Sequence, residues 1–186
     1  MKAMRLLCLA VLAGLFSCGK ADYEYASNHV HFVYDNSIHL DATLASAMNA
    51  MAPGTFCHVW KTGDSHIYFE DFRKEPSKQP ITATERMNAY IIGVYNESGI
   101  IVGFGQREDP PVFYAYDAQC PNCYSDTGLP RYLLTMDSSG KAACKQCSRE
   151  YDLNNHGIIV KGDKGKKLFR YHASTSGPNG VLTVNN

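Results

Sequence analysis

The chain has 186 residues, and its 18 basic side chains balance its 18 acidic ones. Apart from a basic, glycine-rich turn over 161–167, which is expected to be a solvated hairpin tip, it has no basic tract or stripe, so we expect no nucleic-acid partner. The length is enough for one domain with a sizeable core. Twelve tyrosines, eight phenylalanines and fifteen glycines favour strands joined by turns over helices.

The first 17 residues have the pattern of a signal peptide. Lys2 and Arg5 precede an apolar run, residues 6–16, that is too short for a permanent membrane helix of about 20 residues. The run ends in Leu-Phe-Ser-Cys18-Gly19, which resembles the lipobox of bacterial lipoproteins. This resemblance implies that Cys18 carries a lipid and anchors the chain to a membrane of the bacterial cell envelope. Gly19 favours the outer membrane. The alternative is ordinary secretion without a lipid at Cys18.

Residues 18–28 are predicted to form a polar tether, and alternating residues 29–34 a first strand that continues at 38–41. An Ala- and Met-rich segment predicts one short helix over 44–51, ended by Ala52-Pro53-Gly54. Further along, the pattern predicts a hairpin of 55–60 with 66–69, a charged loop over 71–86, and a second hairpin of 89–95 with 99–104.

The second half of the chain continues this β pattern. Predicted strands cover residues 112–116, 132–135, 142–143, 151–159, 168–172 and 181–184. Eight to ten short strands with frequent turns indicate an all-β sandwich or small barrel. No linker divides the chain, so residues 29–186 are predicted to form a single domain.

Two Cys-x-x-Cys pairs carry the clearest chemical signal. Cys120-Pro-Asn-Cys123 and Cys144-Lys-Gln-Cys147 are separated by 20 residues. A two-residue spacer lets one turn present both sulfurs to one centre, and two such turns form a four-thiolate cage for zinc, iron or an iron–sulfur cluster. We therefore expect a rubredoxin- or zinc-ribbon-like metal-binding lobe at about 118–155. In an exported chain the same cysteines could instead form two disulfides.

Residues around the cysteines are candidates for hydrogen bonds to the sulfurs. The backbone N–H groups near Tyr124 and Ser148 are expected to donate to them. The Tyr151 hydroxyl is a third candidate, although an aromatic core position is the commoner reading. His156, just beyond the second pair, is a candidate outer group or alternative ligand.

The segments around the cysteines resemble Rieske iron–sulfur proteins. Phe113-Tyr-Ala-Tyr-Asp-Ala-Gln-Cys120-Pro121 is similar to their strand and first ligand loop, and Cys144-Lys-Gln-Cys147-Ser-Arg-Glu-Tyr151-Asp-Leu to their second. This resemblance implies a Rieske-like antiparallel sandwich and a [2Fe–2S] cluster. Cys123 and Cys147 stand where that family has histidines. Four thiolates favour a potential below the roughly −150 to +300 mV of Rieske centres, or a redox-silent zinc ion, so zinc and iron both stay open.

The remaining residues give no positive case for catalysis. Cys57 next to His58 reads as a buried free thiol more readily than as a nucleophile, and neither a Ser/His/Asp set nor a carboxylate pair is evident. We therefore predict a non-enzymatic envelope lipoprotein that binds a metal through four cysteines, with electron transfer to a redox protein partner if iron is bound. The alternative is an envelope interaction module whose cysteines are structural, with zinc or disulfides.

Overall fold

The computed structural model describes residues 24–186, so the predicted signal peptide and Cys18 lie outside the described residues. Strands dominate this part of the chain, and the all-β prediction is confirmed. The helices are short: α2 (Asn36–His39), α3 (Ala42–Ala47), α4 (Ala83–Met87) and α5 (Pro121–Thr127). Among residues 24–186 no helix has the length and apolar character needed to cross a bilayer.

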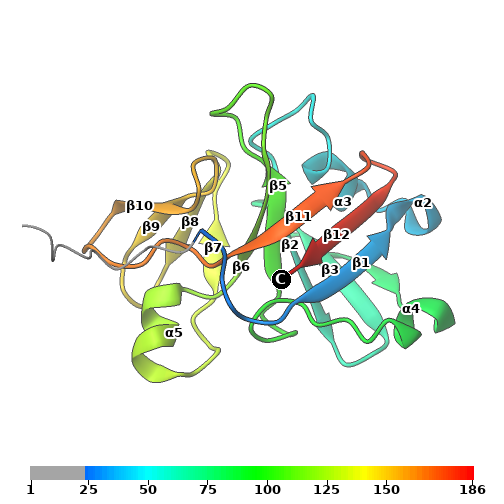
Figure 1. Ribbon diagram of the computed structural model, residues 1–186, viewed down its shortest axis with the longest axis horizontal. Coiled ribbons are helices and arrows are strands. Elements are labelled where there is room, and N and C mark those ends of the chain that lie inside the picture. The colour runs from blue at the N-terminus through cyan, green and yellow to red at the C-terminus, as the bar shows by residue number, and fades with distance from the viewer. Residues whose placement is uncertain (1–23) are drawn as a thin grey trace, which may run out of the picture.

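A large curled antiparallel sheet forms the main body (Figure 1). Its eight strands follow the order β1-β12-β11-β6-β5-β2-β3-β4. Their bounds are β1 (His31–Asp35), β2 (Phe56–Thr62), β3 (His66–Glu70), β4 (Ser77–Pro80), β5 (Ile100–Phe104), β6 (Phe113–Asp117), β11 (Arg170–Thr175) and β12 (Val181–Asn185). Alternate residues such as Phe32 and Tyr34 of β1 point inward and pack with Phe69 and Leu182 into the larger core.

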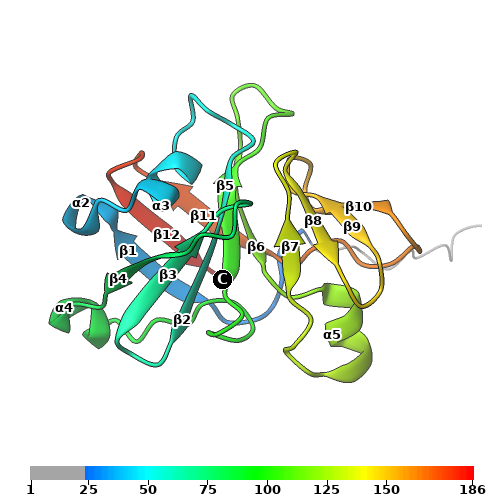
Figure 2. The ribbon, with the colours of Figure 1, turned by 180° about the vertical axis from the view of Figure 1, so that it is seen from behind.

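A second, smaller sheet and helix α5 form a lobe at one end of the molecule (Figures 1 and 2). The strands β7 (Leu134–Met136), β8 (Lys141–Cys144), β9 (Glu150–Asp152) and β10 (Ile158–Lys161) form an antiparallel meander in the order β10-β9-β8-β7. A separate apolar cluster includes Cys120, Cys123, Cys144, Tyr151 and Leu168. Phe56, Ile101, Tyr114 and Tyr116 of the large sheet belong to the same cluster, so the lobe packs on that sheet through a second core of which cysteines are part.

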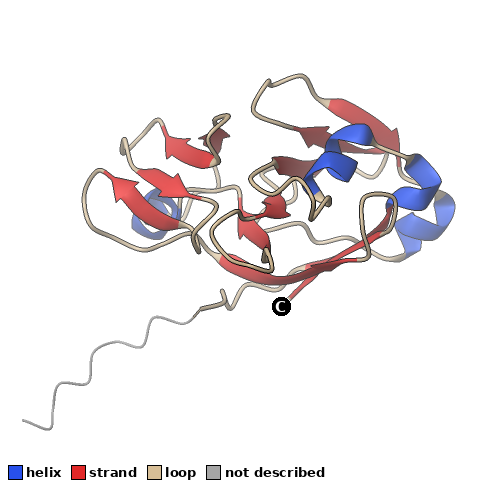
Figure 3. Cartoon of the chain, turned by 90° about the horizontal axis from the view of Figure 1, so that it is seen from above, coloured by secondary structure: helices blue, strands red, loops and turns tan. Residues whose placement is uncertain are grey.

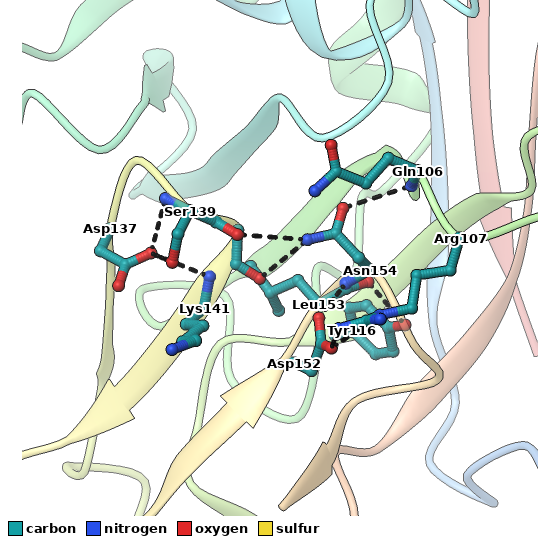
Figure 4. Close-up of polar contacts among 10 residues, drawn as sticks. Gln106, Arg107, Tyr116, Asp137, Ser139, Lys141, Asp152, Leu153 and Asn154 are labelled. Carbon is teal, nitrogen blue, oxygen red and sulfur yellow. Dashed lines mark hydrogen bonds and ion pairs between the residues drawn. The ribbon is translucent and has the colours of Figure 1, made fainter. Parts of the chain in front are cut away.

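Polar contacts join the lobe to the large sheet (Figure 4). The Asn154 amide accepts from the Gln106 N–H and donates to the carbonyl oxygens of Ser139 and Gly140. Asp152 pairs with Arg107 at 2.9 Å, and the buried Tyr116 hydroxyl donates to the Leu153 carbonyl at 3.1 Å. Because these bonds link β9 to the loop after β5 and to β6, the lobe is held in a defined position.

Several predicted elements differ from the structure. Residues 38–41 do not extend β1, because Asp35 caps helix α2 through the Ser37 N–H, and Leu40 ends it with a φ of 51°. The predicted hairpin of 89–95 with 99–104 is wrong. Both edges of β5 are occupied by β2 and β6, so residues 89–95 form a loop there, apart from a single bridge between Ile91 and His31.

Three further boundaries are corrected. Residues 71–86 include the edge strand β4 and the start of α4, whose Thr82 and Glu85 form a capping box. The predicted strand 151–159 is interrupted at 153–157, so that β9 and β10 pair with each other as a hairpin. The helix expected at 44–51 lies at 42–47: it begins earlier, because Asp41 accepts from the Thr43 and Leu44 N–H groups and caps α3, and it ends at Ala47 with Met48 as its C-cap.

The described part of the predicted tether is docked on the body rather than free. The Tyr25 ring stacks on His172, with ring centroids 3.7 Å apart, and the Ala26 N–H donates to the Arg170 carbonyl at 2.8 Å. The Glu24 carboxylate pairs with the Arg170 guanidinium. The described chain therefore starts against β11. Figure 3 shows the molecule from above, with one short helix at one end and the other helices at the opposite end.

Candidate metal centre

The first cysteine pair lies where β6 leads into α5. The Cys120 N–H donates to the Tyr132 carbonyl at 2.8 Å, which fixes the backbone in front of the helix. Cys120 is the N-cap of α5, and Pro121 occupies the first helical position, where a missing N–H has no consequence. Cys123 follows three residues later. Residues three apart share one face of a helix, so both sulfurs point to the same side.

The second pair lies in the tight turn between β8 and β9. The Cys144 N–H donates to the Arg149 carbonyl, and the Ser148 N–H donates back to the Cys144 carbonyl, both at 2.9 Å. Ser148 takes a φ of 56°, which closes the turn. Cys147 therefore lies above Cys144 at the tip of the hairpin, and both sulfurs face α5.

The two pairs converge on one point. All four sulfurs lie within 4.8 Å of one another. Across the pairs, Cys120 Sγ lies 3.6 Å from Cys147 Sγ and Cys123 Sγ lies 3.8 Å from Cys144 Sγ. These distances far exceed a disulfide bond of about 2.05 Å, and the four thiols are free. Three of the cysteines are buried and Cys147 is half-buried, so the group is positioned to hold a metal ion just below the surface.

The thiols differ in their electrostatic surroundings. Burial raises the pKa of Cys123 and of Cys144, and for Cys144 the backbone N–H groups of Cys147 and Gln146 oppose that rise. Burial also acts on Cys147, but hydrogen bonds from Arg149 and from its neighbouring thiols lower its pKa to about 7. Metals bind the thiolate form, so a cation held by these four sulfurs would replace their remaining protons.

A hydrogen-bonded chain supports the site from outside. The Tyr151 hydroxyl lies 3.2 Å from Cys120 Sγ and accepts from the Asn122 amide at 2.9 Å. The same amide donates to the Lys166 carbonyl, and its oxygen accepts from the Lys166 N–H, each at 2.9 Å. The expected contact of Tyr151 with sulfur is therefore present, while the ring also lies in the lobe core.

The other candidate donors have different partners. The N–H groups of Tyr124 and Ser148 themselves donate to the carbonyls of Cys120 and Cys144, because both turns close in helical fashion, four residues back. Beside Ser148, the N–H groups of Gln146 and Cys147 bond to the Cys144 thiol and the Arg149 N–H bonds to the Cys147 thiol, as expected for groups near Ser148. His156 contacts Glu108 and Arg170, each at 3.1 Å, so its two ring nitrogens have partners other than the cysteines. Ser148 thus acts through its backbone conformation, and His156 makes no polar contact with the site.

Two supporting residues were not singled out from the sequence. Asn122 lies inside the first Cys-x-x-Cys spacer, and Arg149 follows the second pair by two positions. The proximity of both to ligand cysteines is a signal that the sequence contains, but their partners, Tyr151 and the 163–166 backbone, are brought near only by folding. Cys57 is buried in the other core and is not part of the group.

In comparisons with known proteins, no family model matches this chain and no curated protein matches it. Its class therefore follows from its own geometry. The chain is an all-β protein with a separate lobe, and that lobe contains a four-cysteine group arranged for a metal ion.

Proposed function

We propose that this protein is a membrane-anchored metal-binding protein of the bacterial cell envelope that holds one zinc ion through Cys120, Cys123, Cys144 and Cys147. The observation that carries the metal assignment is the mutual distance of the sulfurs. A tetrahedral ion with bonds of about 2.3 Å to sulfur needs sulfurs about 3.8 Å apart. The distances of 3.6 and 3.8 Å across the pairs match that edge.

The same distances favour a single ion over a [2Fe–2S] cluster. In such a cluster each iron takes two cysteines, so sulfurs on different irons are spread beyond the edge of one tetrahedron. Here all four lie within 4.8 Å, and the short contacts run between the pairs. Four thiolates also complete the coordination of zinc, which fits a structural rather than a catalytic site. A metal site without an open coordination position supports the proposal that the protein is not an enzyme.

When bound, zinc supplies four strong bonds that cross-link the segments carrying it. Cys120 and Cys123 hold the start of α5, and Cys144 and Cys147 hold the turn between β8 and β9. Tyr151 donates to Cys120 Sγ and orients it, while the Cys147 and Gln146 N–H groups stabilise charge on Cys144. The metal would therefore hold the lobe in one shape. A lobe of fixed shape without an open coordination position fits a protein that works by binding a partner.

A second candidate function is one-electron transfer by a single iron ion in the same cage. The observation that favours it is the partial exposure of Cys147, which brings one ligand to the surface where a redox protein partner could approach. Apart from this ligand the site is enclosed. The zinc and iron proposals use the same residues and differ in the metal alone.

Metal analysis of protein purified without oxygen tests both candidates. We expect about one equivalent of zinc per chain, a colourless solution and, after the metal is removed and the chain is unfolded, free thiols at the four ligands and at Cys57. The Cys57→Ser variant should keep the full metal content, whereas Cys144→Ser should lose it. One iron per chain with visible absorption that bleaches on reduction would replace zinc by the redox function. Two disulfides and no metal would refute both.

The membrane anchor is tested separately. Replacing Cys18 by Ala should move the protein from the membrane to the soluble fraction, since lipidation needs that thiol. Continued membrane association of the Cys18→Ala variant would refute the lipid while leaving the metal site unaffected.

A further inference from the structure

A lysine-rich turn lies against the metal lobe. It spans 161–167 and connects β10 to β11. It contains four lysines, Lys161, Lys164, Lys166 and Lys167, and one carboxylate, Asp163. Lys161 Nζ pairs with the Glu150 carboxylate of β9 at 2.6 Å, and Lys166 Nζ donates to Ser125 Oγ at 2.9 Å, so Lys164 and Lys167 are the lysines on which the argument rests. The first three lysines are exposed and Lys167 is half-buried. This turn, which we call the lysine turn, concentrates positive charge in a chain that is neutral as a whole.

The residues around the metal site hold the backbone of this turn in place. Asn122 forms its two bonds with the Lys166 peptide, and Arg149 donates from Nε to the Asp163 carbonyl at 2.9 Å and from Nη2 to the Lys164 carbonyl at 3.2 Å. Because the polar groups of the backbone are bound on the inner side, the lysine side chains extend from a fixed platform. The turn is therefore a preformed basic surface and not a flexible loop.

Apolar side chains accompany these charges. Ile158 and Val160 of β10 are 39% and 45% exposed, and with Lys161, Lys164 and Lys167 they line a shallow hollow of about 480 Å³. Lysines next to exposed aliphatic side chains are the combination that suits the boundary between lipid headgroups and acyl chains.

The described chain begins next to the lysine turn. Residues from Glu24 to Ser27 and Lys166 to Arg170 line one groove of about 420 Å³, and Figure 1 shows the blue start of the chain beside the orange segment leading into β11. Six residue steps separate Cys18 from Glu24, which is at most about 20 Å of extended chain. A domain of this size is roughly 30–40 Å across. A lipid at Cys18 would thus keep this end of the molecule close to the membrane.

We propose that the lysine turn contacts the headgroups of anionic phospholipids and orients the metal lobe toward the membrane surface. This inference depends on the lipid anchor in the proposed function. It follows from the charge of the turn, its apolar neighbours and the short distance to the attachment point. Each lysine near an anionic surface increases membrane partition about fivefold. Several together are therefore sufficient to select one orientation of an already tethered domain.

The experiment uses the lipidated, metal-loaded protein reconstituted in two kinds of vesicle. One is pure phosphatidylcholine, and the other contains about one third phosphatidylglycerol. Lysines are labelled with a water-soluble amine reagent, and mass spectrometry gives the rate at each site. We expect Lys164 and Lys167 to label at least about fivefold more slowly on the anionic vesicles. Lys78, exposed on β4 at the opposite end of the molecule, should label equally on both and serves as an internal control.

Matched variants extend the test. The triple variant Lys164→Gln, Lys166→Gln, Lys167→Gln should restore the labelling rate of Lys161 on anionic vesicles. The triple variant Lys61→Gln, Lys74→Gln, Lys78→Gln removes the same charge elsewhere and should leave the protection intact. High salt should also abolish protection, because it screens the attraction.

The outcomes separate the two proposals. Protein that floats with both vesicles but labels equally on them overturns the orientation and leaves an acidic protein face as the partner class. Protein that fails to float with either kind refutes the lipid anchor, and the orientation with it.

Discussion

The hydroxyl of Tyr151 is the group whose removal tests the metal site most directly. It lies 3.2 Å from Cys120 Sγ, to which it would donate once that sulfur is a thiolate, and it accepts from the Asn122 amide over 2.9 Å. The Tyr151→Phe substitution deletes one oxygen and keeps the ring in the lobe core. The change therefore removes a hydrogen bond to a ligand sulfur without opening a large cavity.

The magnitude follows from what the hydroxyl contacts. A hydrogen bond to a charged group contributes about 1.5–3 kcal/mol, whereas one to a neutral thiol contributes about 1 kcal/mol. The charged state exists only with the metal bound. The difference, on the order of 1–2 kcal/mol, corresponds to a loss of roughly 5- to 30-fold in metal affinity, which overlaps the range for groups that support metal ligands. The metal-free variant should lose about 1–3 kcal/mol, because one N–H of Asn122 also loses its partner.

Competition with a chromophoric chelator gives the affinity, and denaturant unfolding gives the stability of the metal-free form. Tyr116→Phe is the matched control. The Tyr116 hydroxyl is equally buried in the lobe core but donates to the Leu153 carbonyl. It should lower stability by about 1 kcal/mol and leave metal affinity unchanged.

Equal metal affinity in Tyr151→Phe and the unsubstituted protein would refute this reasoning. It would mean that the hydroxyl does not donate to a thiolate in the loaded state. Equal losses of affinity in both tyrosine variants would also contradict it, since the effect would then come from general loosening of the lobe.

Three further predictions concern the metal, a histidine and a glycine. Removing the metal by chelation should speed amide hydrogen exchange in α5 and in β8–β9, because the ligands join only segments of the lobe. The amides of β1 and β12 should keep their protection. Equal acceleration of exchange in both sheets would contradict a local role of the metal. Burial lowers the pKa of His58 from 6.5 to about 4. As the pH falls, the unfolded chain therefore takes up a proton at His58 before the folded chain does, which favours unfolding. The free energy of unfolding should fall by about 2 kcal/mol between pH 6.5 and pH 4, less than the full pKa difference gives, because His58 is partly exposed. His58→Gln should remove this part of the pH dependence in urea titrations. Gly99→Ala should destabilise the fold by more than about 2 kcal/mol, because its φ is +73° and a Cβ would collide with the Val59 carbonyl; an unchanged melting temperature would contradict the tight β2–β5 packing there.

The predictable parts of the fold are those governed by local pattern. The alternation in 29–34, 55–60 and 66–69 identifies β1, β2 and β3, because each has one face on the core. The failures involve competition between segments. Residues 89–95 are as apolar as a strand, yet β2 and β6 already occupy both edges of β5, and the side chains of Asn96 and Asp117 bind the N–H groups of Ile92 and Val94 instead.

The candidate site divides in the same way. The spacing within each Cys-x-x-Cys pair is a local property, and it identifies all four candidate ligands in advance. The support from Asn122 is different, because its partners Tyr151 and Lys166 are 29 and 44 residues away. No short-range pattern reports such contacts, which depend on how the lobe packs.

The amino-acid sequence by itself determined the strand-rich character of the chain and the two thiol pairs, because both arise from residues a few positions apart. Only the tertiary structure decided that the pairs meet within 4.8 Å and that Tyr151 reaches Cys120. It also decided that the lysine turn is fastened beside the point where the chain enters the domain. These distances result from the packing of α5 against the β8–β9 hairpin. The two segments are far apart in the sequence, and they come together because their contact removes apolar surface from water.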